Sequence, residues 1–441
     1  MKKNILFVVL TLILINYSFG QEILIDSIQS DILKEKRGLK IQLPHDYNEG
    51  EVYPVIYITD GESNNFDIAK NYLNMLSEPV SDIIPSCILV GIIQKDRSKE
   101  LRAFGGGDGK KFSDFINNEL LRHIDSVYQT SGFNLMIGHS DGAEFNHTLL
   151  TSINNPFRGF ISMSTSFHDN MRNNIFLFLK EYNGPSMYYF LANGSRDMSL
   201  RIDAGNELDS LFQIANNKNI KFAKRSYPAD HSGLVSRSLL DGLAFIFQDY
   251  KNMDNYNTIM EYGENYLVDL ENNYGLKGSF SLYDLEKFYD NMFDNKKIDE
   301  YHYWVSLVNK HKLAFGSEID PLNRALHYYE LEMYPESIDW FNKAITEIET
   351  IGASYFYQKI STARNVYIHE NRVSDYIDFL ILSKSALPAN YELYMNYRIA
   401  KISLEEQVAV KKGKKALDFC KANYRENKLF TRDDLTKLEN K

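Results

Sequence analysis

Short apolar runs alternate with amphipathic segments from residue 22 to about residue 250. The apolar runs are rich in Ile, Val, Leu, Phe and Tyr and are bounded by Gly, Pro, Asn or Asp, which is typical of β-strands. Strands are therefore expected at 22–33, 36–43, 54–59, 86–93, 133–138, 158–163, 186–192 and 220–226. Apolar positions with a helical period predict helices at 111–126, 141–152, 203–217 and 234–250.

The order of these segments predicts a layered α/β fold. The continuous apolar run at 87–93 is expected to be a central strand that is buried on both faces. Strands that alternate with helices form a mostly parallel sheet with helices on both sides. No helix separates the first two strands, so that edge of the sheet is expected to be antiparallel.

The pattern changes after about residue 254, where long helical segments replace the Val- and Ile-rich runs. An apolar residue followed by Asp recurs at Ile298, Ile338, Ile377 and Leu417, with spacings of 40, 39 and 40 residues. Such a period predicts stacked helix pairs, an all-α repeat. The alternative is a plain helical bundle in which the spacing is coincidental. We expect one domain over 21–252 and a helical-repeat domain over 253–441.

The N-terminal residues have the pattern of an export signal. Lys2 and Lys3 precede an apolar run at 5–15, and small residues follow, with a cleavage position after Gly20. The run is shorter than the roughly 20 residues that cross a membrane. We predict that 1–20 is a cleaved signal peptide and that the mature protein is periplasmic or secreted; an uncleaved anchor is the alternative.

Composition narrows the classes of partner. The formal net charge is −10, which disfavours nucleic acid because phosphate binding needs a basic surface. The two cysteines, Cys87 and Cys420, fall in different predicted domains, so a disulfide is not expected. No cluster of Cys and His has zinc-site spacing, and we expect no metal and no cofactor.

Residues 133–149 carry the clearest chemical motif. An apolar strand leads into Gly138-His139-Ser140-Asp141-Gly142, and a helical pattern follows. A Gly-X-Ser-X-Gly motif between a strand and a helix is the nucleophile elbow of the α/β-hydrolase fold. The glycines allow the tight turn, because a side chain at either position would collide with the neighbouring strand or helix. Ser140 is the candidate nucleophile.

A nucleophilic serine needs a base and an acid, which follow it in the order Ser, acid, His in this fold. His168 and His231 lie beyond the elbow helix; His231 is favoured as the base because it lies between the last strand and the last helix of the domain. Asp197, after the strand at 186–192, is the candidate acid. Asp203 and Glu207 follow in the next helix.

The oxyanion hole and a substrate-binding group can also be placed. One backbone N–H is expected from Asp141, and the other from the loop after the strand at 54–59, at Gly61 or Glu62. Arg97 and Arg102 are candidates for binding an anionic part of the substrate.

Several segments resemble the esterases of the esterase D and enterochelin-esterase type. The resemblance covers nearly all of 29–250 and rests on the Leu-Pro and Tyr-Pro-Val-Ile-Tyr runs at 43–61, the Val-Gly-Ile segment at 90–92, the elbow and the helix at 241–245. It implies an α/β-hydrolase that acts on siderophore lactones, on feruloyl or acetyl esters of polysaccharide, or on thioesters. The family usually has Gly where this chain has Ala143. The C-terminal part is similar to the tetratricopeptide-like tails of some secreted members, although their period is 34 residues.

Three functions remain open at this point. The first is a carboxylic-ester hydrolase, the second is an acyltransferase on the same scaffold, and the third is a binding protein that uses the helical repeat to recruit a protein partner.

Overall fold

The computed structural model describes residues 23–102, 106–313 and 319–441. The predicted signal peptide at 1–20 lies outside these residues. The described chain divides into two compact units: residues up to Asn255 together with Glu264–Ser279, and Tyr256–Gly263 together with Phe280–Lys441. In the described ranges, no helix is both long enough and apolar enough to cross a bilayer.

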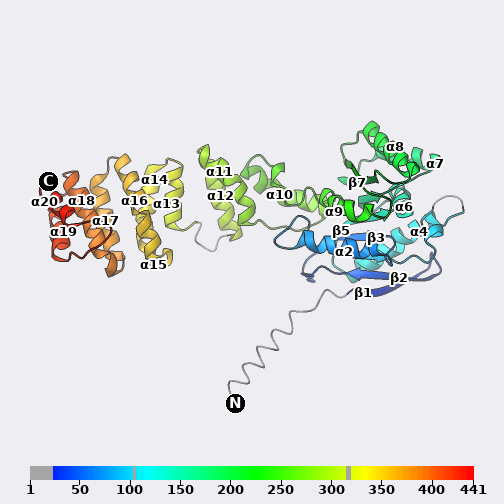
Figure 1. Ribbon diagram of the computed structural model, residues 1–441, viewed down its shortest axis with the longest axis horizontal. Coiled ribbons are helices and arrows are strands. Elements are labelled where there is room, and N and C mark those ends of the chain that lie inside the picture. Colours follow the sequence, from blue (N-terminus) through cyan, green and yellow to red (C-terminus); the bar gives the residue numbers. More distant parts are fainter. Residues whose placement is uncertain (1–22, 103–105, 314–318) are drawn as a thin grey trace, which may run out of the picture. The chain divides into compact units, whose positions relative to one another are not determined.

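The first unit is built on an eight-stranded sheet with the order β1-β2-β4-β3-β5-β6-β7-β8. Figure 1 shows this sheet together with the helices around it. β1 and β2, and β2 and β4, are antiparallel, whereas all other neighbouring pairs are parallel. The antiparallel edge and the parallel body agree with the sequence prediction. The strands are β1 (Leu24–Ser30), β2 (Glu35–Gln42), β3 (Tyr53–Ile58), β4 (Ile88–Ile92), β5 (Thr130–His139), β6 (Phe157–Met163), β7 (Met187–Gly194) and β8 (Ile220–Tyr227).

Helices cover both faces of this sheet. Its helices are α2 (Asn64–Ser77), α3 (Arg97–Glu100), α4 (Gly109–Phe115), a π-helical turn (Ile116–Leu120), α5 (Leu121–Val127), α6 (Asp141–Leu150), α7 (Asp169–Glu181), α8 (Ser199–Ala215) and α9 (Leu234–Ile246). Tyr189 of β7 faces the layer that contains α4, α6, α7 and α8. Phe190, the next residue, faces α9, which packs against α2. Adjacent strand residues thus point to opposite apolar layers, as the continuous apolar runs predict.

The helix α10 (Ile259–Tyr274) is divided between the two units. In the first unit, Tyr274 is buried and its ring lies 5.2 Å from that of Phe133 and 5.3 Å from that of Phe247. Segment 264–279 therefore contributes to the core beneath β5. The sequence-based boundary at 252/253 places this segment in the other domain.

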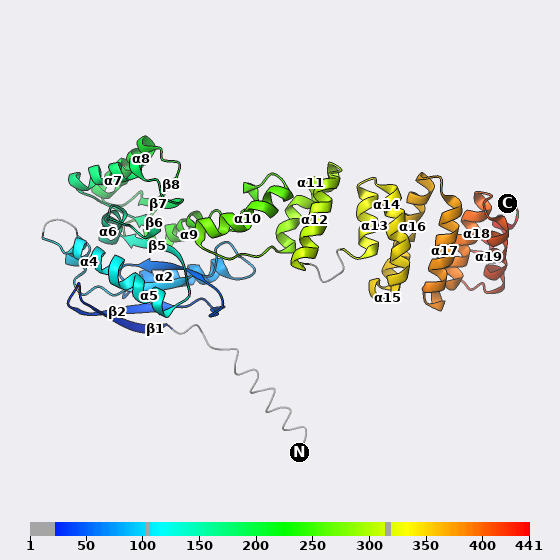
Figure 2. The same ribbon diagram turned by 180° about the vertical axis from the view of Figure 1, so that it is seen from behind.

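The second unit is all-helical, and its helices follow one another in pairs (Figure 2). α13 packs against α14, α16 against α17, and α18 against α19. Three of the repeated apolar residues, Ile338, Ile377 and Leu417, are buried in the second helix of a pair. Whether these pairs form a tetratricopeptide-like array stays a prediction. The helices are α11 (Leu282–Asp294), α12 (Ile298–His311), α13 (Pro321–Glu330), α14 (Tyr334–Ala344), α15 (Ile348–Ile351), α16 (Ala353–His369), α17 (Val373–Ala386), α18 (Glu392–Glu405), α19 (Val410–Ala422) and α20 (Arg432–Glu439).

Candidate active site

Ser140 lies in the turn that joins β5 to α6. Its backbone has φ 61° and ψ −121°, a conformation that a serine rarely adopts. The Ser140 N–H donates to the carbonyl oxygen of Met163 at 3.0 Å, and the Ser140 carbonyl accepts the N–H groups of Ala143 and Glu144. These bonds hold the strained turn between the neighbouring strand and the first turn of the helix, as a nucleophile elbow requires.

The two motif glycines are required by close contacts on both sides of this turn. A Cβ atom added to Gly138 would lie 2.2 Å from the carbonyl oxygen of Gly142. A Cβ atom added to Gly142 would lie 2.3 Å from Thr59 Oγ1, at the end of β3. Both distances are far below van der Waals contact, so the physical reason given for Gly-X-Ser-X-Gly from the sequence agrees with the packing.

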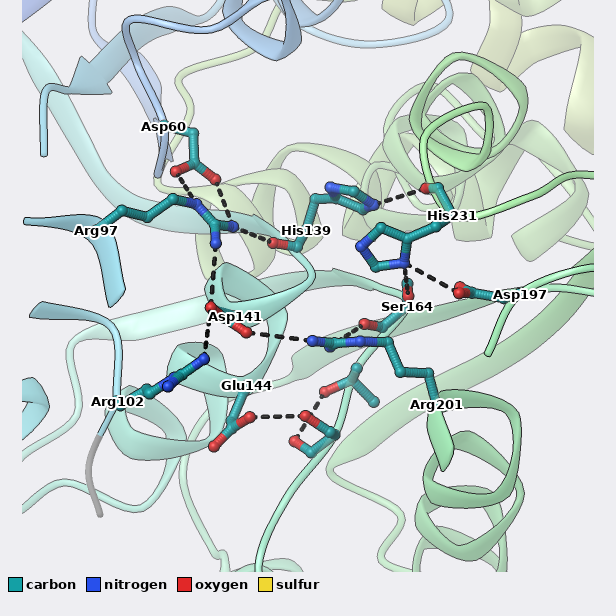
Figure 3. Close-up of polar contacts among 12 residues, drawn as sticks. Asp60, Arg97, Arg102, His139, Asp141, Glu144, Ser164, Asp197, Arg201 and His231 are labelled. Atoms are coloured by element: carbon teal, nitrogen blue, oxygen red, sulfur yellow. Dashed lines mark hydrogen bonds and ion pairs between the residues drawn. The ribbon is translucent and has the colours of Figure 1, made fainter. Parts of the chain in front are cut away.

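His231 and Asp197 form a hydrogen-bonded pair at the same edge of the sheet (Figure 3). Asp197 Oδ1 lies 3.0 Å from His231 Nδ1, and the Asp197 side chain has no exposed surface. Burial raises the pKa of Asp197, but hydrogen bonds from Ser164, the Met198 N–H and His231 outweigh burial, and the net pKa is lowered. Asp197 is thus an ionised acceptor, which favours a proton on Nδ1 of His231 and leaves Nε2 as the basic nitrogen.

Ser164 is a third member of this cluster and was not identified from the sequence. It follows β6, is fully buried, and has a left-handed backbone with φ 58°. Its Oγ lies 2.9 Å from His231 Nδ1, and its hydroxyl also bonds to Asp197. The hydroxyl can donate to the carboxylate while it accepts from the imidazole N–H. No motif marks Ser164; its position at the end of a parallel strand was the available signal.

His139 fixes the loop that carries His231. His139 Nε2 lies 2.9 Å from the carbonyl oxygen of His231, and the two rings are 4.7 Å apart. Burial, together with the neighbouring His231, lowers the pKa of His139 to about 4. His139 is therefore neutral near pH 7 and donates its Nε2–H to that carbonyl. Neither the motif nor the chain order identified His139 for this role.

The register of the sheet brings the candidate nucleophile Ser140 and the candidate base His231 to the same end of β5 and β6. His139 pairs with Met163 in the register of β5 and β6, so that Ser140 and Ser164 come next on the two strands. Ser164 in turn contacts His231. Among the hydrogen bonds of the described residues, none joins Ser140 Oγ to His231; catalytic hydrogen bonds of this kind often tighten only when substrate binds.

The oxyanion prediction needs one correction. The Gly61 N–H donates to the carbonyl oxygen of Ile92 at 2.9 Å and is therefore occupied. Gly61 is a glycine because a Cβ atom there would lie 2.5 Å from the backbone of Gly91 in β4. Within the described part of the chain, the Glu62 N–H makes no hydrogen bond. Asp141, the first residue of α6, also has an N–H without an intrahelical acceptor. Glu62 and Asp141 remain the candidate donors.

The contacts of Arg97 favour a different role from the predicted binding of an anionic part of the substrate. It forms a bidentate ion pair with Asp60, at 2.6 and 3.1 Å, and donates to Asp141 at 3.1 Å and to the His139 carbonyl at 3.2 Å. These bonds use four of its five N–H groups. Arg97 therefore connects the loop after β3 to the elbow, and we assign it to positioning rather than to substrate binding.

Two further arginines, Arg201 and Arg102, contact the Asp141 carboxylate (Figure 3). Arg201 of α8 donates to Asp141 at 3.1 Å and to the Ser164 carbonyl at 2.7 Å, so it ties the elbow to the end of β6. Arg201 is buried and was not identified from the sequence. Arg102 lies 3.7 Å from Asp141 and its side chain is 55% exposed. Arg102 thus retains donors that face solvent.

The other polar candidates lie outside this cluster. His168 is exposed and lies 3.7 Å from Glu144. Asp203 is exposed on α8, and Glu207 forms an ion pair with Arg172. His147 is fully buried against Tyr189, as a packing residue would be. In the described ranges, no group of three or more Asp, Glu, His or Cys side chains has the arrangement of a metal site.

Comparison with known proteins agrees with this fold. Residues 30–232 match the model of the family described as "Putative esterase". An IroE-like serine hydrolase from Shewanella oneidensis is similar over 66% of this chain and 97% of its own, with 23% identity and a TM-score of 0.53. An uncharacterised protein from Capnocytophaga ochracea is similar over 78% of this chain and 100% of its own, with 15% identity and a TM-score of 0.63. No curated protein matches the chain.

The family match confirms the resemblance that the sequence motifs indicated, and the two structural likenesses support the α/β fold. The matched residues contain the whole span from β2 to the loop of His231. Residues 30–232 therefore match the esterase family, and the chain is a hydrolase that acts on ester bonds.

Proposed function

We propose that the protein is an exported serine esterase that works through an acyl-enzyme on Ser140. The observation that carries the proposal is the strained turn at Ser140 next to the hydrogen-bonded cluster of His231, Asp197 and Ser164. A strained, buried arrangement of this kind costs free energy and is typical of catalytic sites.

In the proposed reaction, Ser140 Oγ attacks the carbonyl carbon of the ester and His231 Nε2 takes the hydroxyl proton. The N–H groups of Asp141 and Glu62 donate to the oxyanion that forms. The C–O bond to the alcohol then breaks, and His231 returns the proton to the departing alcohol oxygen. Water attacks the acyl-enzyme in the same way and releases the acid. Asp197 stays ionised throughout and stabilises the imidazolium.

The substrate that we propose carries an anionic group beside the ester. Arg102 supports this, because among the described residues its exposed guanidinium has a single loose partner, the Asp141 carboxylate at 3.7 Å. A siderophore or an esterified polysaccharide would suit an exported enzyme. Export itself rests on the sequence of residues 1–20, and N-terminal sequencing of the mature protein would test it.

The first experiment is hydrolysis of p-nitrophenyl acetate and butyrate by the mature chain, beside Ser140→Ala and His231→Ala. We expect both variants to lose about 10³-fold or more in kcat. A fluorophosphonate should label the wild type and not Ser140→Ala. An active Ser140→Ala variant would contradict the proposal. Acyl transfer to an added alcohol without net hydrolysis would identify the enzyme as an acyltransferase, and an inactive, unlabelled wild type would favour a binding protein.

A further inference from the structure

The second unit contains a cavity of about 480 Å³ between three helices. Glu286, Tyr289 and Asp290 of α11 line it along one helical face, because they are three to four residues apart. Trp304 of α12 and His327 of α13 complete the aromatic part of the wall. The volume lies in the range of small-molecule sites.

Contacts among the aromatic residues hold this wall of the cavity in place. The rings of Tyr289 and Trp304 are 6.2 Å apart at an angle of 73°, and the His327 ring lies 5.7 and 5.8 Å from them. The Tyr289 hydroxyl is 2.8 Å from His327 Nε2, while Nδ1 of the buried His327 has no hydrogen-bond partner among the described residues. Asn323, also in the lining, accepts a hydrogen bond from Tyr355 at 2.9 Å. The wall is thus held in place by contacts from three helices.

The charge of the cavity is negative. Glu286 and Asp290 are exposed, and in the part of the chain that the structure describes neither carboxylate forms a salt bridge. Burial, together with the positive charge of nearby Arg324, lowers the pKa of His327 to about 4, so this ring is uncharged near pH 7. Among the described residues, Arg324 forms no salt bridge with either acid; it stacks on Trp340 and donates to the Ile319 carbonyl.

We propose that this cavity binds a small organic cation with an apolar stem, such as the side chain of arginine or a free amine of that size. Electron-rich faces of Tyr and Trp attract a cation within about 6 Å of the ring centroid. The two carboxylates supply charge-assisted hydrogen bonds to the same group. The apolar stem of such a cation would contact the aromatic wall. A neutral ligand would leave both carboxylates without a partner.

The test uses the fluorescence of Trp304 in the full mature chain. The sequence has two tryptophans, so Trp340→Phe leaves Trp304 as the only one. The probes are the blocked peptide Gly-Arg-Gly, agmatine as a free cation, and the isosteric neutral peptide Gly-citrulline-Gly. We expect the two cations to shift the emission in a saturable way at concentrations up to about 10 mM, with citrulline weaker by at least about tenfold. Agmatine alone would identify a free amine as the ligand, whereas the peptide alone would identify a basic side chain.

The matched variants are Glu286→Gln with Asp290→Asn, and the control Glu406→Gln with Glu426→Gln, which removes two exposed charges away from the cavity. The first pair should weaken cation binding by at least about tenfold with an unchanged circular dichroism spectrum, and the control pair should not. Equal binding of the arginine and citrulline peptides, equal loss in both pairs, or no binding at all would overturn the proposal. None of these readouts depends on esterase activity.

Discussion

Ser164 bridges the imidazole of His231 and the carboxylate of Asp197. We expect Ser164→Ala to lower kcat by about 10- to 100-fold, because a hydrogen bond to a charged group contributes about 1.5–3 kcal/mol. Removal of the hydroxyl leaves more negative charge on Asp197 to stabilise the imidazolium. This change in the charge that faces the imidazole should move the acidic limb of the kcat/KM profile to higher pH. Ser164→Thr retains the hydroxyl and should restore much of the activity.

A loss of folded protein alone would lower the amplitude of that profile without moving its acidic limb. An unmoved limb in a folded Ser164→Ala variant would contradict the positioning role. The pH–rate profile on p-nitrophenyl acetate measures both quantities.

Arg97 and Arg102 lie beside the same carboxylate, yet their contacts predict different kinetic effects. Arg97→Lys loses the bidentate geometry on Asp60, so the oxyanion loop shifts relative to Ser140 and kcat should fall by about 10- to 100-fold on a neutral ester. Arg102→Ala should leave kcat on that ester nearly unchanged. Steady-state kinetics on neutral and anionic esters would separate the two. A raised KM for anionic esters alone in Arg97→Lys would restore it as a substrate-binding residue.

Among the site residues, those that stand in a motif or follow a known chain order could be predicted from the sequence. Ser140 stands in the elbow motif, and His231 and Asp197 follow it in the expected order. Arg201 could not be found in this way, because its partners Asp141 and Ser164 lie 60 and 37 positions away in the chain. The contacts of Arg97 could not be predicted for the same reason, because the number of its free donors depends on partners from other segments of the chain.

The turn between β5 and α6 is an element whose shape the glycines determine. Gly142→Ala would place a methyl group against Thr59 Oγ1 and force α6 away from β3. We expect a destabilisation of about 1–3 kcal/mol and a loss of about 10²-fold in kcat, because Ser140 is displaced. Urea unfolding and steady-state kinetics measure the two effects.

Ala143, the residue after Gly142, supplies the control variant. Ala143→Gly should cost only about 1 kcal/mol in helix propensity and keep most of the activity. Similar activity in the two variants would show that the contact with Thr59 does not position Ser140.

The strands could be predicted from the sequence better than some of the helices. All eight strands were expected. Central strands such as β3, β4 and β7 are continuous apolar runs that are buried on both faces, whereas the edge strands β1 and β8 are partly exposed. Helices α2 and α7 were missed, although α2 buries Phe66, Ala69, Leu73 and Leu76 along one face. Both helices are rich in Asn, which has a low helix propensity, and their apolar stripes are broken by polar residues. Packing against the sheet, rather than local preference, determines these two helices.

At the scale of the whole chain, the sequence pattern and the contacts divide the chain at different places. The change of pattern near residue 254 marks the end of the strands, since strand and helix periodicities differ. It carries no signal for segment 264–279, which is helical in sequence but belongs to the first unit by its contacts. Tyr274 is the residue that shows why, because three aromatic rings of that unit surround it, those of Phe133, Tyr188 and Phe247.

Tyr274→Ala should therefore destabilise the esterase unit. Loss of a fully buried large aromatic ring costs about 3–5 kcal/mol, and the loss should fall on the unit that the ring fills. Hydrogen exchange of the full chain measures this by region: we expect faster exchange in β5 and β7 and unchanged exchange in α16 to α19. Tyr283→Ala, at a residue that is 82% exposed, is the control and should change neither region. Faster exchange in α16 to α19 alone would instead support the boundary at 252/253, because Tyr274 would then stabilise the helical domain.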